Sequence, residues 1–374
     1  MNRPFTVDAD SHVLEPPDLW LRYLEPKFRD RAILIRPAPG GEELVIDNEV
    51  IMKGRLAGLG GAEHDAAKVF VDADIPYLAT CPAASYDTAA RIRLMDDWGV
   101  DAGITFPTIG ILWDKEEDPE LAMAYARAYN NWQRDFAAPC PDRIVPIAHI
   151  PLYDAELALI ELRRCLKLGF KGMFVAPERV MGKRPSHPDF DPLWAELSDA
   201  GLPVCLHVIV RFRRPVGISI QNWYEREESN LLFGFGLGGT MQLVPAVTSM
   251  VCDGLFDRFP KLKVLVVEAG AGFAAYVMDR LDEKFDRFGA LAPLDMKPSE
   301  YFRRNLWFVM DPGERSIDAQ CDLVGEDRFL WGSDYPHIDS HINAADEVRA
   351  SLAPMTEHRR NLVLGGNAGA LFSL

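Results

Sequence analysis

Acidic and imidazole side chains stand at the ends of four hydrophobic runs of the sequence. The first run, FTVDADSH, contains Asp10 and His12, which are two positions apart and therefore lie on one face of an extended strand. His207 ends the run PVCLH, Glu268 follows LKVLVV, and Asp334 follows RFLWGS. Such nitrogen and carboxylate oxygen donors suit a divalent zinc, manganese or iron ion. We therefore expect Asp10, His12, His207, Glu268 and Asp334 to bind metal, with one ion favoured over two.

A bound ion of this kind would supply hydrolytic chemistry. An open coordination position lowers the pKa of bound water towards ~7, and Asp334 beside the ion is the expected general base for attack on a carbonyl group. His337 could donate a proton, bind a second ion or be a solvated loop residue, and Glu268 could bind the ion or orient a water molecule. The first interpretation is therefore a metal-dependent hydrolase.

Two other reactions fit the same residues. In a non-oxidative decarboxylase the ion would hold a carboxylate or phenolic oxygen of the substrate and collect the electrons released with carbon dioxide. With His337 included, the three carboxylates and three imidazoles are enough donors for two iron or manganese ions, so a dinuclear oxygenase is a third interpretation. A binding protein without catalysis is the remaining alternative, and metal analysis separates these classes.

The segment 208–239 contains candidate contacts for a small-molecule substrate. It carries Arg211, Arg213 and Trp223, followed by the glycine-rich run FGFGLGG. Guanidinium groups bind carboxylates through paired hydrogen bonds, so the arginines could hold a substrate carboxylate. An exposed charge cluster or a subunit contact explains the arginines equally well. We take all three residues as candidates for substrate binding.

The elements that would position these residues alternate between short β-type runs and longer helical segments, which is typical of βα units. Eight strands, each followed by a helix, predict an α/β protein with the (β/α)8 TIM barrel fold. The expected strands are 5–10, 102–106, 144–149, 171–175, 203–207, 262–267, 305–309 and 328–332. The expected helices are 87–98, 119–138, 154–168, 190–200, 240–258, 272–288, 314–324 and 342–352.

Two long segments do not fit a minimal barrel. Residues 14–86 form an expected insertion after the first strand, and its run ELVIDNEVIM predicts a hairpin that turns at Asp47–Asn48. Residues 208–239 form an expected long loop after the fifth strand. Long loops at the carboxyl ends of barrel strands usually shape the active site. No linker marks a second domain, so we expect a single domain over residues 1–374.

Composition excludes several classes of partner. The chain has 56 acidic and 40 basic side chains, a formal charge of −16, which disfavours nucleic acid and anionic membrane surfaces. None of the six cysteines forms a CxxC motif. The N-terminal residues lack the apolar run of a signal peptide, and we find no apolar stretch near the ~20 residues that span a bilayer. We expect a cytoplasmic enzyme with a small-molecule substrate.

Five motifs, taken together, carry a family resemblance: DADSHVLEPPDLW, GLPVCLHV, FPKLKVLVVEAGAGFAAYVMDRLD, WGSDYPH and GGNAGALF. With these motifs the chain resembles the amidohydrolase superfamily, specifically the amidohydrolase-2 group that contains aminocarboxymuconate-semialdehyde decarboxylase-like enzymes. The resemblance covers nearly the whole chain and implies Asp10, His12, His207 and Asp334 as metal ligands. It also implies a homo- or hetero-oligomer, for which the insertion offers apolar residues such as Leu56 and Leu59.

The chain departs from the pattern of this group at two positions. Asp10 replaces the first His of the common His-x-His motif, and its anionic oxygen still suits a metal ion. Glu268 stands where the decarboxylase-like members commonly place a His, which argues against a decarboxylase. The end of the fourth strand carries no lysine, since Lys171 lies at its beginning, so a lysine-bridged pair of ions is not expected.

Overall fold

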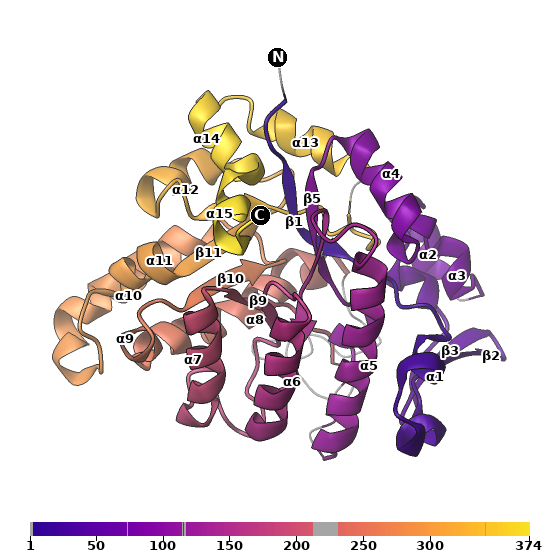
Figure 1. The fold of residues 1–374 in the computed structure, drawn as a ribbon. Helices are drawn as coiled ribbons and strands as arrows, with labels where there is room; N and C mark the ends of the chain where they lie inside the picture. The colour runs from indigo at the N-terminus through magenta and orange to yellow at the C-terminus, as the bar shows by residue number, and fades with distance from the viewer. Residues whose placement is uncertain (1–2, 73, 114, 116, 212–230, 341) are drawn as a thin grey trace.

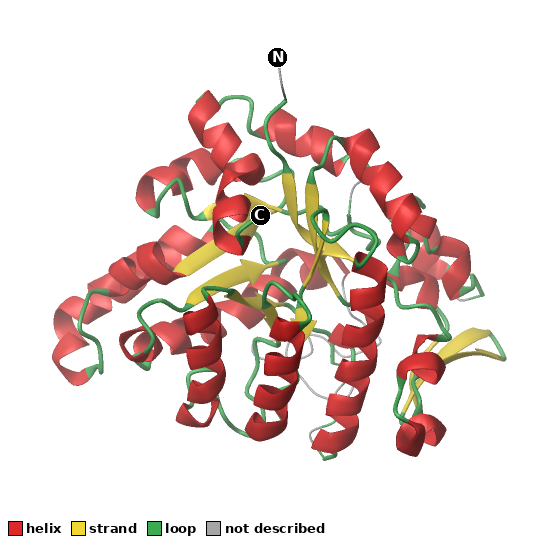
Figure 2. Cartoon of the chain, in the orientation of Figure 1, coloured by secondary structure: helices red, strands yellow, loops and turns green. Residues whose placement is uncertain are grey.

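A computed structural model describes residues 3–374 apart from 73, 114, 116, 212–230 and 341. In the described part of the chain, parallel strands form a ring that helices surround (Figures 1 and 2). The strands are β1 (Val7–His12), β5 (Ala102–Phe106), β6 (Ile144–Pro146), β7 (Ala148–His149), β8 (Met173–Val175), β9 (Pro203–His207), β10 (Lys263–Val267), β11 (Leu306–Met310) and β12 (Phe329–Trp331). β6 and β7 are two parts of one expected strand, so a strand lies at each of the eight expected places.

The ring closes at both junctions between its two hydrogen-bonded arcs. One arc has the order β1-β5-β6 and the other β12-β11-β10-β9-β8-β7. The chain itself joins β6 to β7. At the other junction the backbone N–H groups of Ser333 and Asp334 donate to the carbonyl of Asp10, at 3.1 and 2.8 Å. The expected α/β barrel is therefore present.

The helices outside the ring largely match the expected ones. Asp87, Asp118 and Asp154 cap the first turns of α4, α5 and α6 with their side chains, and Gly99 and Gly201 end α4 and α7 with φ of 62° and 68°. The helices that follow the barrel strands are α4 (Thr88–Trp98), α5 (Pro119–Ala137), α6 (Ala155–Lys167), α7 (Asp191–Ala200), α8 (Leu231–Cys252), α10 (Phe273–Phe288), α12 (Ile317–Leu323) and α13 (Ala344–Ser351). The others are α1 (Leu19–Tyr23), α2 (Ala66–Val71), α3 (Tyr77–Thr80), α9 (Leu255–Arg258), α11 (Pro298–Asn305), α14 (Glu357–Asn361) and α15 (Asn367–Phe372).

α8 differs most from its expected range. The structure describes it from Leu231, whereas the glycine-rich run had predicted a loop until residue 239, because glycine disfavours helix interiors. A Cβ at Gly239 would lie 2.6 Å from the carbonyl oxygen of Glu268, so glycine permits close packing on the barrel. The expectation that no apolar stretch reaches membrane-spanning length is also wrong, since Leu232–Cys252 does so by length and composition.

Polar contacts attach α8 to the barrel. The Gln242 side chain exchanges two hydrogen bonds of 3.0 Å with the backbone of Ile209, and Thr240 donates to the carbonyl of Ala269 at 2.7 Å. These contacts fix α8 against the segments that follow β9 and β10. α8 is thus one of the outer helices of the barrel, with only 28% of its apolar window buried.

The insertion contains one strand more than expected. β2 (Leu34–Ala38), β3 (Gly41–Ile46) and β4 (Glu49–Lys53) form an antiparallel sheet in that order. Asp47 and Asn48 have φ of 53° and 63° and form the expected turn between β3 and β4. β2 contains Pro37, which is tolerated because β2 is an edge strand. Leu56 is only 1% exposed, so it is not available for the subunit contact that we expected of it.

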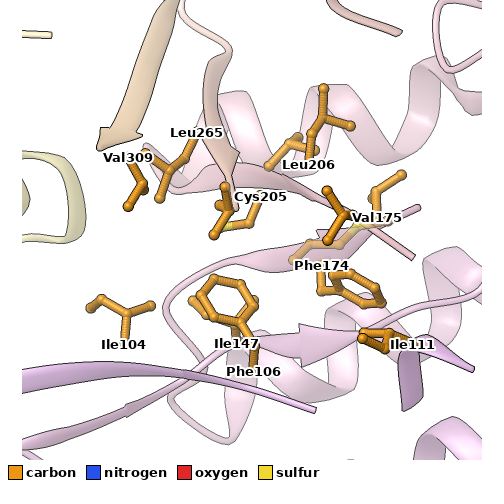
Figure 3. Packing of buried hydrophobic residues seen from close by; sticks show 14 of the residues in the cluster. Ile104, Phe106, Ile111, Ile147, Phe174, Val175, Cys205, Leu206, Leu265 and Val309 are labelled. Atoms are coloured by element: carbon orange, nitrogen blue, oxygen red, sulfur yellow. The ribbon is translucent and has the colours of Figure 1, made fainter. Parts of the chain in front are cut away.

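Apolar side chains fill the interior of the barrel (Figure 3). Phe106, Phe174 and Cys205 come from β5, β8 and β9 and are at most 1% exposed. Cys205 lies two residues before His207 on the same face of β9, so the apolar layer lies directly beneath that histidine. Burial raises the pKa of the Cys205 thiol well above its usual value. Cys205 is therefore a packing residue.

Candidate metal centre

The five expected metal-binding residues lie together at one end of the barrel. Asp10 and His12 are on β1, His207 ends β9, Glu268 follows β10, and Asp334 lies just beyond β12. Parallel barrel strands end on a common rim, which explains why distant parts of the sequence meet here. His12 and His207 are completely buried, whereas the side chains of Glu268 and Asp334 are 23% and 16% exposed. The site therefore opens to solvent on the side of these two acids.

The spacing of the donor atoms suits a metal ion. Nε2 of His12 and Nε2 of His207 are 3.1 Å apart, and Oδ1 of Asp10 lies 3.4 and 3.6 Å from them. Oε2 of Glu268 is 3.1 Å from Nε2 of His207, and Oδ1 of Asp334 is 3.4 Å from Nε2 of His12. Ligands that bond at ~2.1 Å and lie at right angles about an ion are ~3.0 Å apart. These distances are close to that separation.

Backbone carbonyls set the tautomers of both imidazoles. Nδ1 of His12 donates to the Pro107 carbonyl at 2.9 Å, and Nδ1 of His207 donates to the Val208 carbonyl at 2.8 Å. A carbonyl only accepts, so in the neutral rings each Nε2 presents a lone pair to the site. Burial lowers the pKa of His12 to about 3 and keeps this ring neutral. The facing lone pairs repel each other unless a cation lies between them.

Three buried carboxylate oxygens point to the same cation. Within the described residues, Oδ1 of Asp10, Oε2 of Glu268 and Oδ1 of Asp334 have no hydrogen-bond partner. Burial and repulsion by neighbouring acids raise the pKa of Glu268 and of Asp334 well above their usual values. Burial also acts to raise the pKa of Asp10, but the two imidazoles outweigh it and lower that pKa. A divalent ion would satisfy all three oxygens, so the donor set fits one.

Two acids support the strained backbone next to Glu268 and Asp334, the two candidate metal donors that are partly exposed. Glu268 and Asp334 have φ of 58° and 55°, a region that side chains other than glycine rarely adopt. Glu314 accepts the backbone N–H groups that follow Glu268, at Ala271 and Gly272. Asp8 accepts the N–H and hydroxyl of Ser333, next to Asp334, at 2.9 and 2.6 Å. Each strained ligand thus adjoins a segment that a carboxylate fixes.

His337 lies inside the site and is only 8% exposed, which excludes the solvated loop role. Its Nδ1 is 2.7 Å from Oδ1 of Asp334, a close ionic contact without the geometry of a directed hydrogen bond. Its Nε2 is 2.9 Å from the Thr108 hydroxyl oxygen. That hydroxyl donates its own hydrogen to the Val13 carbonyl, at 2.8 Å. The hydroxyl therefore accepts from His337, so Nε2 carries hydrogen and Nδ1 faces Asp334. Thr108 was not among the expected site residues.

The candidate substrate contacts have different outcomes. Arg211 is only 7% exposed, so the exposed charge cluster is wrong for this residue. Its guanidinium donates to Oε1 of Glu178 at 2.9 Å and to the Ile111 carbonyl at 2.8 Å. Arg213 and Trp223 lie outside the described residues. Sequence analysis missed Glu178, although its place shortly after the fourth strand was a signal for a rim residue.

A hollow lies beside the metal-binding residues. His149 and Phe174 line it from the ends of β7 and β8, and Arg211 lines it from the segment after β9. Phe174 also contacts the ring of His207, with centroids 5.6 Å apart, so one aromatic ring separates the hollow from a metal-binding residue. His149 is 5% exposed, and its Nδ1 has no hydrogen-bond partner in the described structure. The other walls of the hollow are formed by Trp113, Ile150, Pro151, Leu152, Tyr153, Ala176, Glu178 and Val180.

Comparison with known proteins places the chain in a family. Residues 71–374 match the family model Amidohydro_2, described as amidohydrolase, over more than half of the chain. The chain belongs to this family. The match agrees with the resemblance noted from the sequence motifs, and with the cluster of His, Asp and Glu donors it identifies a metal-dependent enzyme.

Curated relatives of this enzyme are named as decarboxylases. One is 2-amino-3-carboxymuconate-6-semialdehyde decarboxylase of Dictyostelium discoideum, 24% identical over 82% of each chain. Another is gamma-resorcylate decarboxylase of a Rhizobium species, 26% identical over 76% of this chain and 86% of the relative. Hydrolysis, the first interpretation from the sequence, is not the reaction that these names give. The alternative of non-oxidative decarboxylation agrees with them better.

Solved structures share the fold. An amidohydrolase from Mycobacterium avium subsp. paratuberculosis has a TM-score of 0.81, with 24% identity and complete coverage of both chains. A dihydroxybenzoic acid decarboxylase from Polaromonas has a TM-score of 0.69, with 21% identity over 100% of this chain and 98% of the other. The Polaromonas structure holds manganese and the inhibitor 2-nitroresorcinol.

Proposed function

We propose that this enzyme is a metal-dependent, non-oxidative decarboxylase of a small aromatic or unsaturated carboxylic acid. The observation that carries the proposal is the placement of the Asp334–His337 pair at the open side of a buried set of metal donors. Decarboxylation needs an electrophilic centre for the substrate oxygens and a group that supplies one proton to carbon, and the site offers both side by side. The reaction named for the relatives supports the same conclusion.

Asp10, His12, His207 and Glu268 would hold the ion, with Asp334 as a further donor. We propose manganese, which suits mixed oxygen and imidazole donors. When bound, the ion would anchor the substrate oxygens and draw electrons from the carbon–carbon bond that breaks. The two overlapping donor groups share His12 and Glu268, and the His12 ring can serve only one ion, through Nε2, because its Nδ1 is bonded to the Pro107 carbonyl. One ion therefore accounts for the donor set.

The Asp334–His337 pair would supply the proton. Loss of carbon dioxide breaks one carbon–carbon bond, and the electron pair left on carbon takes up one proton to form a carbon–hydrogen bond. The Thr108 hydroxyl fixes His337 so that Nδ1 lies 2.7 Å from Oδ1 of Asp334. His337 holds the proton there, and Asp334, which reaches the opening of the site, passes it to the substrate carbon. Burial lowers the pKa of His337 against the opposing effect of nearby acids, so a proton held on this ring is readily given up.

Side chains of the hollow beside Phe174 would contact the part of the substrate that does not react. Its walls include the rings of Trp113 and Phe174, which suit a flat unsaturated group. Arg211 is held by Glu178 and therefore contributes a fixed N–H surface, with its charge balanced by the acid. Arg213 and Trp223 stay candidates for further substrate contacts.

The test is carbon dioxide release by enzyme loaded with manganese. The panel contains 2,6-dihydroxybenzoate (gamma-resorcylate), 5-carboxyvanillate, and matched esters and lactones. We expect carbon dioxide and, in D2O, one deuterium at the vacated carbon of the product. Cleavage of the esters or lactones without carbon dioxide release would reject the proposal in favour of hydrolysis. Oxygen uptake with two metal ions per chain would reject it in favour of an oxygenase.

Assembly and location are also proposals. We propose an oligomer in which the insertion takes part, because Val50 on β4 is 47% exposed. Sedimentation velocity across a range of concentrations tests this, and a monomer throughout would reject it. A reducing cytoplasm suits the six cysteines, all of which are free thiols in the structure.

A further inference from the structure

Glu15 is a buried carboxylate with no part in the reaction proposed above. It is completely buried, and its oxygens accept hydrogen bonds from three successive backbone N–H groups. Thr108 and Gly110 donate to Oε1 at 3.2 and 3.1 Å, and Ile109 donates to Oε2 at 2.8 Å. A carboxylate in an apolar interior costs several kcal/mol unless it is hydrogen-bonded. Glu15 is therefore committed to the segment 107–113, which follows β5.

The segment 107–113 accepts hydrogen bonds from three side chains around the site. The Pro107 carbonyl accepts from Nδ1 of His12 at 2.9 Å. The Thr108 hydroxyl accepts from Nε2 of His337 at 2.9 Å, and the Ile111 carbonyl accepts from Arg211 at 2.8 Å. One short piece of chain thus touches a metal-binding imidazole, the imidazole that holds the proton and the arginine of the hollow.

One peptide group joins Glu15 to His12. The N–H of Thr108 and the carbonyl of Pro107 belong to the same planar peptide unit, in which the two groups point in opposite directions. The N–H donates to Glu15 on one side, and the carbonyl accepts from His12 on the other. Rotating this unit would break both hydrogen bonds at once. The carboxylate of Glu15 therefore fixes the acceptor that holds the His12 ring.

The segment has little room to find another arrangement. A Cβ at Gly110 would lie 2.6 Å from Cβ of Pro107, so the turn is already at close contact. Residues 109–111 form a single 3₁₀ turn, and its backbone N–H groups at Ile109 and Gly110 point to Glu15. Loss of these acceptors would leave three inward-facing N–H groups without partners, and the turn would have to move to satisfy them.

We propose that Glu15 is a positioning residue of the metal centre. Through the Pro107–Thr108 peptide it sets the direction of His12, and so aims the Nε2 lone pair at the ion. Through the Thr108 hydroxyl it also fixes His337 beside Asp334. This proposal rests on the metal site of the proposed function, and it does not depend on which reaction the site catalyses.

The experiment compares Mn²⁺ affinity in Glu15→Gln and Glu161→Gln, measured without substrate by electron paramagnetic resonance of free Mn²⁺. Both oxygens of Glu15 accept from N–H groups. In the Gln variant an NH2 group replaces one of these oxygens, so it must face at least one backbone N–H that it cannot accept from. Partners of metal ligands are worth ~10 to 100-fold in affinity, and we expect the lower end, about tenfold. Glu161 is a matched control because it is also completely buried, but bonds to Arg164 and Asn130 on the outer helices. Its variant should keep wild-type Mn²⁺ affinity.

A Glu15→Gln variant that binds Mn²⁺ as tightly as wild type, while its Tm falls like that of Glu161→Gln, would overturn the proposal. If Glu15→Gln does not fold, Glu15→Asp takes its place. The shorter acid keeps its acceptors but cannot reach all three N–H groups, so weaker Mn²⁺ binding supports the proposal and unchanged binding overturns it. An enzyme that shows the Mn²⁺ effect but releases no carbon dioxide would reject the proposed function alone.

Discussion

Replacing Glu268 by Gln should have opposite effects on the metal-free and the metal-bound enzyme. Without metal, burial and repulsion from Asp334 and Asp10 disfavour the Glu268 carboxylate, which is why its pKa is raised. A neutral amide of the same size removes that repulsion. We therefore expect metal-free Glu268→Gln to unfold at a Tm equal to or above that of the metal-free wild type. A substitution that removed only a packing contact would lower it.

With metal, the wild type should have the higher Tm, because the variant loses an anionic donor. At a Mn²⁺ concentration of about 100 times the wild-type Kd, binding stabilises the wild type by about 2.7 kcal/mol. At about 2.1 cal/mol/K per residue, a chain of 374 residues gains about 0.8 kcal/mol/K of entropy on unfolding, so Tm should rise by about 3 °C. Losing a direct donor should cost at least the ~100-fold upper end seen for the outer partners of metal ligands, so the variant should gain about 0.4 kcal/mol or less at the same concentration.

The assay is scanning calorimetry of chelator-treated protein, with and without Mn²⁺, supported by metal analysis of the same samples. Glu161→Gln serves as the control, because Glu161 is a buried acid on α6 that lies outside the donor set. The reasoning is refuted if Glu268→Gln shows the full Mn²⁺ shift of the wild type. It is also refuted if the metal-free variant loses as much stability as the control, since Glu268 would then be an ordinary buried acid.

Three further substitutions or treatments test other parts of the site. His337→Gln should lower kcat by ~10² to 10⁴-fold with little change in KM, because proton transfer is lost while substrate contacts remain. An unchanged kcat in steady-state assays would show that His337 takes no part in the reaction. Arg211→Met should destabilise the fold by up to about 3 to 5 kcal/mol, because it removes the guanidinium that pairs with the buried Glu178 at 2.9 Å, and Arg211→Met with Glu178→Leu should recover part of that loss in urea unfolding. Iodoacetamide at pH 8 should not label Cys205 in the folded enzyme, because burial raises the pKa of its thiol; rapid labelling detected by mass spectrometry would show that β9 opens.

The barrel could be predicted from sequence because its strands have a local signal. Short aliphatic and β-branched runs mark each buried strand, and helix caps such as Asp87 and Gly99 depend on neighbouring residues only. The exceptions have non-local causes. The glycines of α8 disfavour a helix in isolation, but at Gly239 the close approach of the Glu268 carbonyl leaves no room for a side chain. β2 was missed because its proline is acceptable only on an edge strand, which tertiary pairing determines.

The metal donors were also predictable, because barrel topology places strand ends on one rim. A residue type and its position at the end of a strand were enough for Asp10, His12 and His207. The supporting contacts had no such signal. Glu15 lies 93 residues before the N–H of Thr108 that it binds, and the Pro107 carbonyl is a backbone atom that every residue type has. Sequence spacing cannot indicate these partners, and only the folded chain reveals them.

The clustered carboxylates of this site link metal binding to the stability of the fold. These carboxylates destabilise the metal-free fold, because burial and mutual repulsion disfavour their charged forms. Strained backbone at Glu268 and Asp334 adds to that cost. Such arrangements persist where the surrounding structure holds them and a ligand recovers part of the energy, and here buried carboxylates brace the neighbouring segments. The strain that destabilises the metal-free protein therefore links Mn²⁺ binding strongly to folding. Each substitution that removes repulsion between these carboxylates should also lower the affinity for Mn²⁺.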